Sequence, residues 1–104
     1  MVAGTGPRGL PAAEAADPAR QAERCLELVD DVLDAAGSRL GELVRLRVYV
    51  RDAATIEAVR AVCIGAFREE APAMTFVVAG LPEADWAVML EGDAIIGQHR
   101  ATTG

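Results

Sequence analysis

The spacing of apolar residues along the chain predicts two helices. Between Asp17 and Gly37, apolar residues recur at spacings of one and three, as they do along one side of a helix: Ala22, Cys25, Leu26, Val29, Val32, Leu33 and Ala36. Asp17 can cap the first turn, Pro18 suits the first helical position, and Gly37 favours an end to the helix. A second stripe predicts a helix over about 53–67, capped by Asp52: Ile56, Val59, Val62, Cys63, Ala66 and Phe67.

Alternation of residue types predicts three strands. Over 43–51 one face is apolar and the opposite face is polar, with Val44, Leu46, Val48 and Val50 on the first and Arg45, Arg47, Tyr49 and Arg51 on the second. A second strand is predicted over 74–79, closed by Gly80, Leu81 and Pro82. The last is predicted over 86–96, where Gly92 indicates a bulge or a close approach. Residues 1–3 are consistent with the end of a further strand.

This order of elements predicts a two-layer α+β domain in which two amphipathic helices lie on one face of a sheet. With 104 residues, we expect one domain over 1–104, with a polar, flexible tail at 97–104. Two helices on one side leave the other face of the sheet uncovered. Its three Arg and one Tyr suggest contact with water, carboxylates or a partner.

Composition narrows the function classes. The net charge of −6 argues against a nucleic-acid partner. No apolar run approaches the roughly 18 residues of a membrane span, and the start of the chain lacks the pattern of a signal peptide. We therefore expect a cytoplasmic protein without a membrane or nucleic-acid partner. Two cysteines do not make a disulfide scaffold.

Few residues have the pattern of a catalytic or metal site. Cys25 and Cys63 lie on the apolar stripes of the predicted helices and are interpreted as small core residues. His99, the one histidine, lies in the polar tail, so neither a Cys–His pair nor a metal site is expected. No motif indicates a cofactor.

Glu91 and Asp93 are two positions apart on one strand and therefore project the same way. Paired carboxylates can transfer protons or hold a hard cation. The alternatives are an ion pair with Arg45 or Arg47 on a neighbouring strand, or a solvated face. Glu91, nearer the middle of the strand, is the candidate catalytic residue.

Several segments, in order, resemble the RidA/YjgF family over about residues 2–96. They are Val2–Thr5, Gln21–Arg24 with the helix up to Gly37, Val44–Asp52, Pro72–Thr75, Val78–Pro82 and Val88–Ala94. The resemblance implies a chorismate-mutase-like fold and a homotrimer with the bare sheet faces packed around a central barrel. It places Arg45, Arg47 and Tyr49 at or near subunit contacts. It also implies a site between subunits that hydrolyses enamines or imines, such as 2-aminoacrylate, to a keto acid and ammonia.

The chain departs from this family at the residues that carry its chemistry. Met74 stands where active members have an Arg that binds the substrate carboxylate, and a thioether cannot form those two hydrogen bonds. Phe76 replaces a frequent Cys, and Ala3 replaces a Ser. In the family the last strand usually carries two Glu at alternate positions. The preferred register aligns them with Met89 and Glu91. A two-residue shift would instead align Glu91 with the first of the two Glu. The resemblance also implies about 25 residues before Val2 that form a hairpin and supply a site Tyr, and the sequence from Met1 does not include them.

These departures leave several functions open. The favoured hypothesis is a family-like protein that binds a small, more apolar ligand in the cleft between subunits, lined by Met74, Phe76, Met89 and Ala3, with Glu91 as the polar or acid–base group. One alternative is an enamine/imine hydrolase. Another is a structural or interaction protein without catalysis. The endoribonuclease activity once attached to the family name does not suit an acidic chain that lacks a catalytic His.

Overall fold

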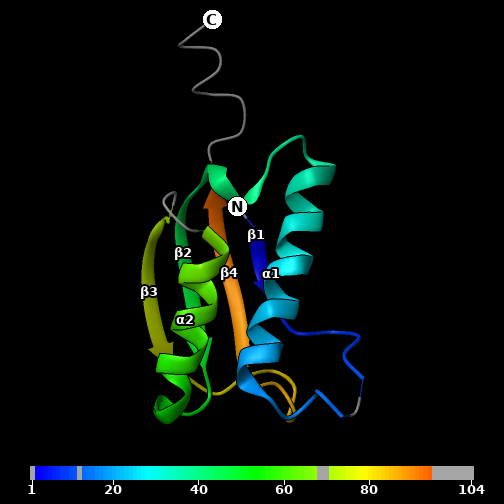
Figure 1. Cartoon of the computed structure of the whole chain (residues 1–104), viewed down its shortest axis with the longest axis vertical. Helices are drawn as coiled ribbons and strands as arrows, with labels where there is room; N and C mark the ends of the chain where they lie inside the picture. The colour runs from blue at the N-terminus through cyan, green and yellow to red at the C-terminus, as the bar shows by residue number, and fades with distance from the viewer. Residues whose placement is uncertain (1, 12, 68–70, 95–104) are drawn as a thin grey trace, which may run out of the picture.

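Two helices lie on the same side of a four-stranded sheet in the computed structural model, which describes residues 2–11, 13–67 and 71–94 (Figure 1). The elements, in chain order, are β1 (Val2–Thr5), α1 (Pro18–Ala35), β2 (Leu43–Val50), α2 (Ile56–Phe67), β3 (Ala73–Val78) and β4 (Val88–Ala94). Short 3-10 turns, Leu40–Glu42 and Ala53–Thr55, precede β2 and α2. The predicted two-layer α+β architecture is confirmed.

The sheet is mixed, with strand order β1-β4-β2-β3. β4 runs antiparallel to both β1 and β2, whereas β3 runs parallel to β2. A parallel pair needs a crossover connection, and α2 supplies it by carrying the chain back along the sheet. β4 and β2 are therefore the central strands, and β3 lies at one edge.

Both helices begin where the sequence predicts a cap. Asp17 accepts a hydrogen bond from the backbone N–H of Ala19 at 3.0 Å, and Asp52 accepts one from Ala54 at 2.9 Å. The second helix differs slightly from the prediction, because its first turn is the 3-10 turn and the α-helix starts at Ile56. Gly37 has a φ of +80°, a left-handed conformation that ends α1 at low cost in a residue without Cβ.

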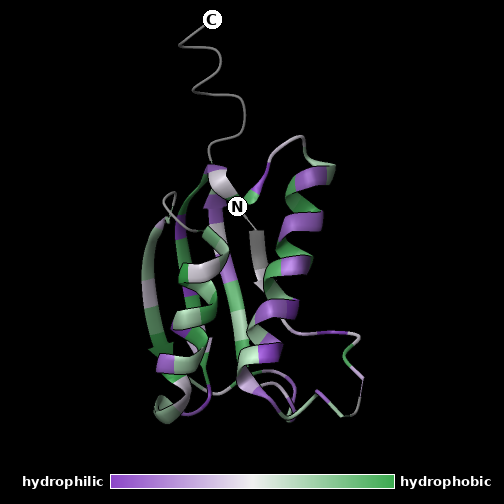
Figure 2. Cartoon of the chain, in the orientation of Figure 1, coloured by the Kyte–Doolittle hydropathy of each residue, from purple (hydrophilic) through white to green (hydrophobic). Residues whose placement is uncertain are grey.

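The core lies between the helices and one face of the sheet. It is formed by five α1 residues, three α2 residues and alternate strand residues: Ala22, Cys25, Leu26, Val29, Leu33, Val59, Cys63, Phe67, Leu43, Leu46, Val48, Val50, Val88 and Leu90. Figure 2 agrees with this arrangement, because α1 and the central strands are banded in hydrophilic and hydrophobic positions. Val32 and Ala36, predicted on the buried stripe of α1, are exposed, as is Ala66 of α2.

The predicted inward orientation of Val44 is wrong. Leu43 pairs with Ala94 and Arg45 pairs with Asp93, so Val44 is an extra residue on β2. Such a bulge shifts the alternation by one position. Leu43 is consequently buried at 3% exposure, and Val44 is 46% exposed. Gly92 lies beside this bulge, where an added Cβ would lie 3.1 Å from Cδ2 of Leu43, so the predicted close approach is confirmed.

The last strand is shorter at its start than predicted. Trp86 and Ala87 precede β4 in a loop, and the indole ring of Trp86 lies against Gly6, where an added Cβ would be 2.3 Å from its atoms. The predicted continuation over 95–96 and the tail at 97–104 lie outside the described residues. Within the described part of the chain, no helix is both long enough and apolar enough to cross a membrane.

Candidate functional site

The open face of the sheet, turned away from the helices, has a polar cluster at its centre. In the pairing of β2 with β4, Arg47 lies opposite Glu91 and Tyr49 lies opposite Met89. Oε1 of Glu91 accepts hydrogen bonds from Nε of Arg47 at 3.0 Å and from the hydroxyl of Tyr49 at 3.1 Å. The ion pair with Arg47, one of the alternatives stated for Glu91, is therefore present.

The cluster is partly shielded from solvent. The side chains of Glu91 and Arg47 are 24% and 33% exposed. Desolvation raises the pKa of the Tyr49 hydroxyl above its ordinary value, and the hydrogen bond to Glu91 and the charge of that carboxylate raise it further. Because both donors contact Oε1, the second oxygen of Glu91 can still accept a hydrogen bond. Glu91 is thus a carboxylate held in a fixed orientation.

Other predicted site residues surround this cluster on the open face. Arg45 lies next to Asp93, with 3.7 Å between guanidinium and carboxylate. The thioether of Met89 lies over β1, because an added Cβ on Gly4 would be 3.1 Å from its sulfur. Ala3 lies in β1, but its side chain is outside the described residues. The open face therefore combines paired charges at its centre with an apolar thioether toward β1.

Met74 and Phe76 lie on the opposite side of the sheet. Their β2 partners are Leu46 and Val48, so both point toward the helix layer, where they pack at the edge of the core. Together with α2 they line a pocket of about 280 Å³ whose other walls are Ile56, Arg60, Ile64 and Pro72. We call this the β3–α2 pocket; it is mostly apolar and carries one guanidinium.

Within one chain, the predicted cleft residues do not form a single site. Met74 and Phe76 face α2 at the β3 edge, whereas Met89 and Glu91 face away from the helices on β4. β2 lies between the two strands. The candidate residues therefore fall into two separate groups, one apolar and one mainly polar, which we call the two candidate half-sites.

The α2 wall of the β3–α2 pocket was not predicted from the sequence. Ile56, Arg60 and Ile64 are spaced four apart, which places them on one side of a helix, so the signal was available. Ile64 lay outside the predicted core stripe, is 47% exposed and lines this pocket together with Ile56 and Arg60. The ion pair of Arg60 with Glu57 is long, at 3.7 Å, and both side chains are well exposed.

The two cysteines are core residues, as predicted. Both are free thiols with no solvent exposure. Burial raises the pKa of Cys25 to about 12 and that of Cys63 to about 11, so neither is a thiolate near neutral pH. No group of three or more possible metal ligands occurs among the described residues, and His99 lies outside them.

A family model described as Endoribonuclease L-PSP matches residues 1–96 of the chain. A crystal structure of Rv2704, described as a member of the YjgF/YER057c/UK114 family from Mycobacterium tuberculosis, is 31% identical. The alignment covers 91% of this chain and 76% of that chain, with a TM-score of 0.82. The protein belongs to the YjgF/RidA family.

Further solved structures have a similar fold. The YjgF gene product from E. coli is 27% identical, with 90% of this chain and 77% of that chain covered and a TM-score of 0.78. A protein described as a putative endoribonuclease from Thermotoga maritima is 22% identical, with 90% and 76% covered and a TM-score of 0.76, and shares the fold. No match was found among functionally curated proteins. The resemblance inferred from the sequence and its chorismate-mutase-like fold are therefore confirmed.

Proposed function

We propose that this YjgF/RidA-family protein is a homotrimer that binds a small, largely apolar metabolite in clefts between its subunits and lacks the family's usual enamine/imine deaminase activity. The observation that carries the proposal is the β3–α2 pocket. Five of its six lining residues are apolar, and Met74 occupies the position where the family resemblance implies a carboxylate-binding Arg. Pockets of this composition favour apolar ligands oriented by a few polar groups.

Assembly of the cleft needs a second subunit. The β3–α2 pocket and the Glu91 cluster lie on opposite faces of one sheet, so one chain cannot present both to the same ligand. A neighbouring subunit that places its open face beside the β3 edge would bring the two half-sites together. In that arrangement Arg45, Arg47 and Tyr49 would lie at the contact, and Glu91 would be the polar or acid–base group of the cleft.

Arg60 would orient the ligand in the pocket. It is the one charged side chain of the six that line the pocket, and its ion pair with Glu57 is long and solvent-exposed. Exposed pairs of this kind are weak, so the guanidinium can turn to an anionic group of a ligand. We therefore expect a ligand with an apolar body and one acidic end.

Ligand binding and assembly can be tested on the full chain. Sedimentation equilibrium should give the mass of three copies. In thermal-shift measurements, aromatic and branched aliphatic monocarboxylates should raise the melting temperature more than simple 2-keto acids do. Ammonia release from freshly generated 2-aminoacrylate should not exceed the rate in buffer. Stabilisation by simple 2-keto acids alone would contradict the apolar cleft, and ammonia release above the buffer rate would contradict the loss of deaminase activity.

A substitution that restores the missing guanidinium sharpens this test. Met74→Arg should let simple 2-keto acids stabilise the protein, because Arg can bind a carboxylate through two hydrogen bonds. Val78→Arg is the matched control, since Val78 lies on the same strand and face as Met74 and is 53% exposed. Equal responses of the two variants to 2-keto acids would show that position 74 is not part of the ligand site.

Hydrolysis of enamines or imines is the second candidate function. It is favoured by one observation, the Glu91 carboxylate held by Arg47 and Tyr49, because a fixed carboxylate can orient or deprotonate water. If the wild-type protein releases ammonia from 2-aminoacrylate, Glu91→Gln should abolish that release, while Asp93→Asn should retain it.

A further inference from the structure

The outer face of α2 has the composition of a surface that is covered by another molecule. Glu57 and Arg60 are the only charged residues of the whole α2 helix, and Figure 2 shows far fewer hydrophilic positions on α2 than on α1. A helix that is apolar on all sides is normally buried on all sides. In this chain the sheet covers only one side of α2, and Ile64, Gly65 and Ala66 remain exposed.

A groove runs between α1 and α2 on this outer surface. Its volume is about 450 Å³, and its apolar floor is formed by Leu26, Leu40 and Val62. The α2 wall is made of small residues, including Gly65, and a Cβ built on Gly65 meets nothing within 4 Å. Small side chains on one wall allow another helix to approach closely, as when an amphipathic helix packs into an apolar groove.

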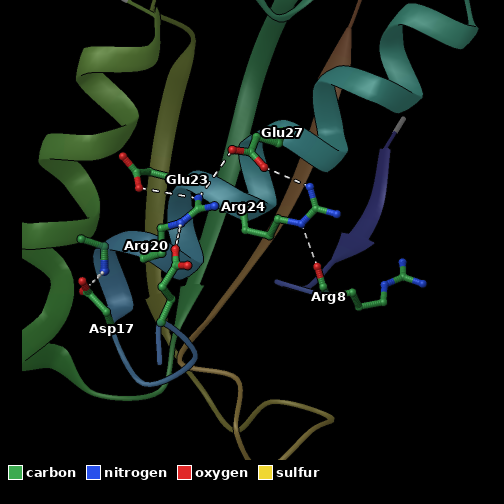
Figure 3. Close-up of polar contacts among 8 residues, drawn as sticks. Arg8, Asp17, Arg20, Glu23, Arg24 and Glu27 are labelled. Carbon is green, nitrogen blue, oxygen red and sulfur yellow. Dashed lines mark hydrogen bonds and ion pairs between the residues drawn. The ribbon is translucent and has the colours of Figure 1, made fainter. Parts of the chain in front are cut away.

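The α1 wall of the groove is acidic. Glu23, Glu27 and Asp30 line it, and none of the residues lining the groove is basic. Figure 3 shows that Arg20 contacts Glu23 and Glu27, and that Arg24 bridges Glu27 and the backbone carbonyl of Arg8. These pairs lie at the surface and are individually weak. Asp30, one turn further along α1, has no ion pair within the described residues, and α1 as a whole carries five acidic and two basic residues.

We propose that the α1–α2 groove binds a basic amphipathic helix of a partner protein. The apolar stripe of that helix would pack on Leu26 and Val62 over Gly65, and its Lys or Arg residues would lie along Glu27 and Asp30. A second copy of this chain fits the groove less well, because the chain carries a net charge of −6 and would bring like charges together. The groove and the β3–α2 pocket share no lining residue, so this proposal does not rest on the metabolite site.

Two synthetic peptides test the charge and shape of the groove. One is an 18-residue helix of Leu and Lys with a single apolar stripe; the other has the same pattern with Glu in place of Lys. Fluorescence anisotropy should show that the full-length protein binds the Lys peptide at least about tenfold more tightly than the Glu peptide, a difference of about 1.4 kcal/mol. Added salt should weaken the binding. Equal affinities for the two peptides would overturn the proposal.

Two pairs of variants locate the binding. Gly65→Leu should reduce affinity at least about tenfold by filling the groove, whereas Gly65→Ala should leave it within about twofold. Both should fold, because the site has open space and each residue favours a helix more than Gly does. Asp30→Lys should weaken binding more than Asp31→Lys, which makes the same charge change outside the groove. If Gly65→Leu and Gly65→Ala have the same affinity for the Lys peptide, or if Asp30→Lys and Asp31→Lys weaken it equally, the peptide binds elsewhere.

The same variants distinguish a second copy from a partner protein. If the groove joins two copies of this chain, Gly65→Leu should lower the mass of the protein alone in sedimentation equilibrium. That result would overturn the proposal. An unchanged mass together with lost peptide binding is the expected outcome.

Discussion

The two faces of the sheet are built from the same strands but have opposite chemistry. On the covered face, Leu46 and Val48 pair across the sheet with Gly92 and Leu90, and all four are buried. On the open face the intervening residues form ion pairs, Arg47 with Glu91 and Arg45 with Asp93. The covered face is completed within the chain by α1 and α2. The open face keeps oriented, half-exposed polar groups, as expected of a surface that meets something outside the chain.

Neighbouring residues on β4 give the largest expected difference between the faces. Leu90 is fully buried, so Leu90→Ala should lower the free energy of unfolding by about 3 kcal/mol through lost burial and the remaining cavity. Met89→Ala, one position away on the open face, should cost less, about 1 kcal/mol, because within the chain its side chain is only partly buried. Urea unfolding of both variants measures the difference.

Equal losses from Leu90→Ala and Met89→Ala would contradict this comparison. They would mean that the open face is as tightly packed as the core under the conditions of the measurement. Unfolding at several protein concentrations would then show whether contact between copies supplies that packing.

The buried thiols beneath the helices should make the covered face sensitive to alkaline pH. The pKa values of Cys25 and Cys63 are raised to about 12 and about 11, whereas in the unfolded chain both thiols ionise near 9. Above pH 9 the unfolded chain loses protons that the folded chain retains, so stability falls as the pH rises. Between pH 7 and pH 10 the loss should be about 2–3 kcal/mol for the two thiols together. Urea unfolding under reducing conditions measures it.

A double variant, Cys25→Ala with Cys63→Ala, is the control for this pH dependence. It should be less stable than the wild-type protein at pH 7, because two buried side chains are shortened, yet its stability should change less between pH 7 and pH 10. If the free energy of unfolding falls equally with pH in both proteins, groups other than the two thiols cause the loss of stability at alkaline pH.

The smallest expected effect lies in the Glu91 cluster and is best seen by spectroscopy. Tyr49 is the one tyrosine of the chain, so the ultraviolet absorbance of its phenolate reports this site alone. Glu91→Gln should lower the pKa of Tyr49 toward its ordinary value, because a neutral amide no longer opposes ionisation of the phenol. The free energy of unfolding should change by less than about 1 kcal/mol, as for other partly exposed ion pairs.

Asp93→Asn is the control for the tyrosine titration. Asp93 lies on the same strand and face as Glu91, but its ion-pair partner is Arg45. Its substitution should leave the pKa of Tyr49 nearly unchanged. A shift of similar size in both variants would indicate a general effect of charge on the open face and no specific hydrogen bond.

The sequence by itself determined the elements, their order and the family. These elements follow from local patterns: the apolar stripe of α1, the caps at Asp17 and Asp52 and the alternation in β2. Helix and strand periodicity sets the first and last of these, and the caps bind N–H groups of the first helical turn that have no partner within the helix. The ion pair of Glu91 with Arg47 was among the stated alternatives, because two adjacent strands with charged residues on one face bring such residues together.

Only the tertiary structure decided what depends on register and on contacts between distant segments. The bulge that turns Val44 outward arises in the pairing of β2 with β4, and no local pattern marks it. The parallel pairing of β3 with β2 directs Met74 and Phe76 toward α2, on the side opposite to Glu91. This pairing brings Met74 and Phe76 into the same pocket as Arg60, which was not predicted to be part of a site. A one-residue change in register reverses the face of every side chain, so the composition of a site built across strands is fixed only when the strands pair.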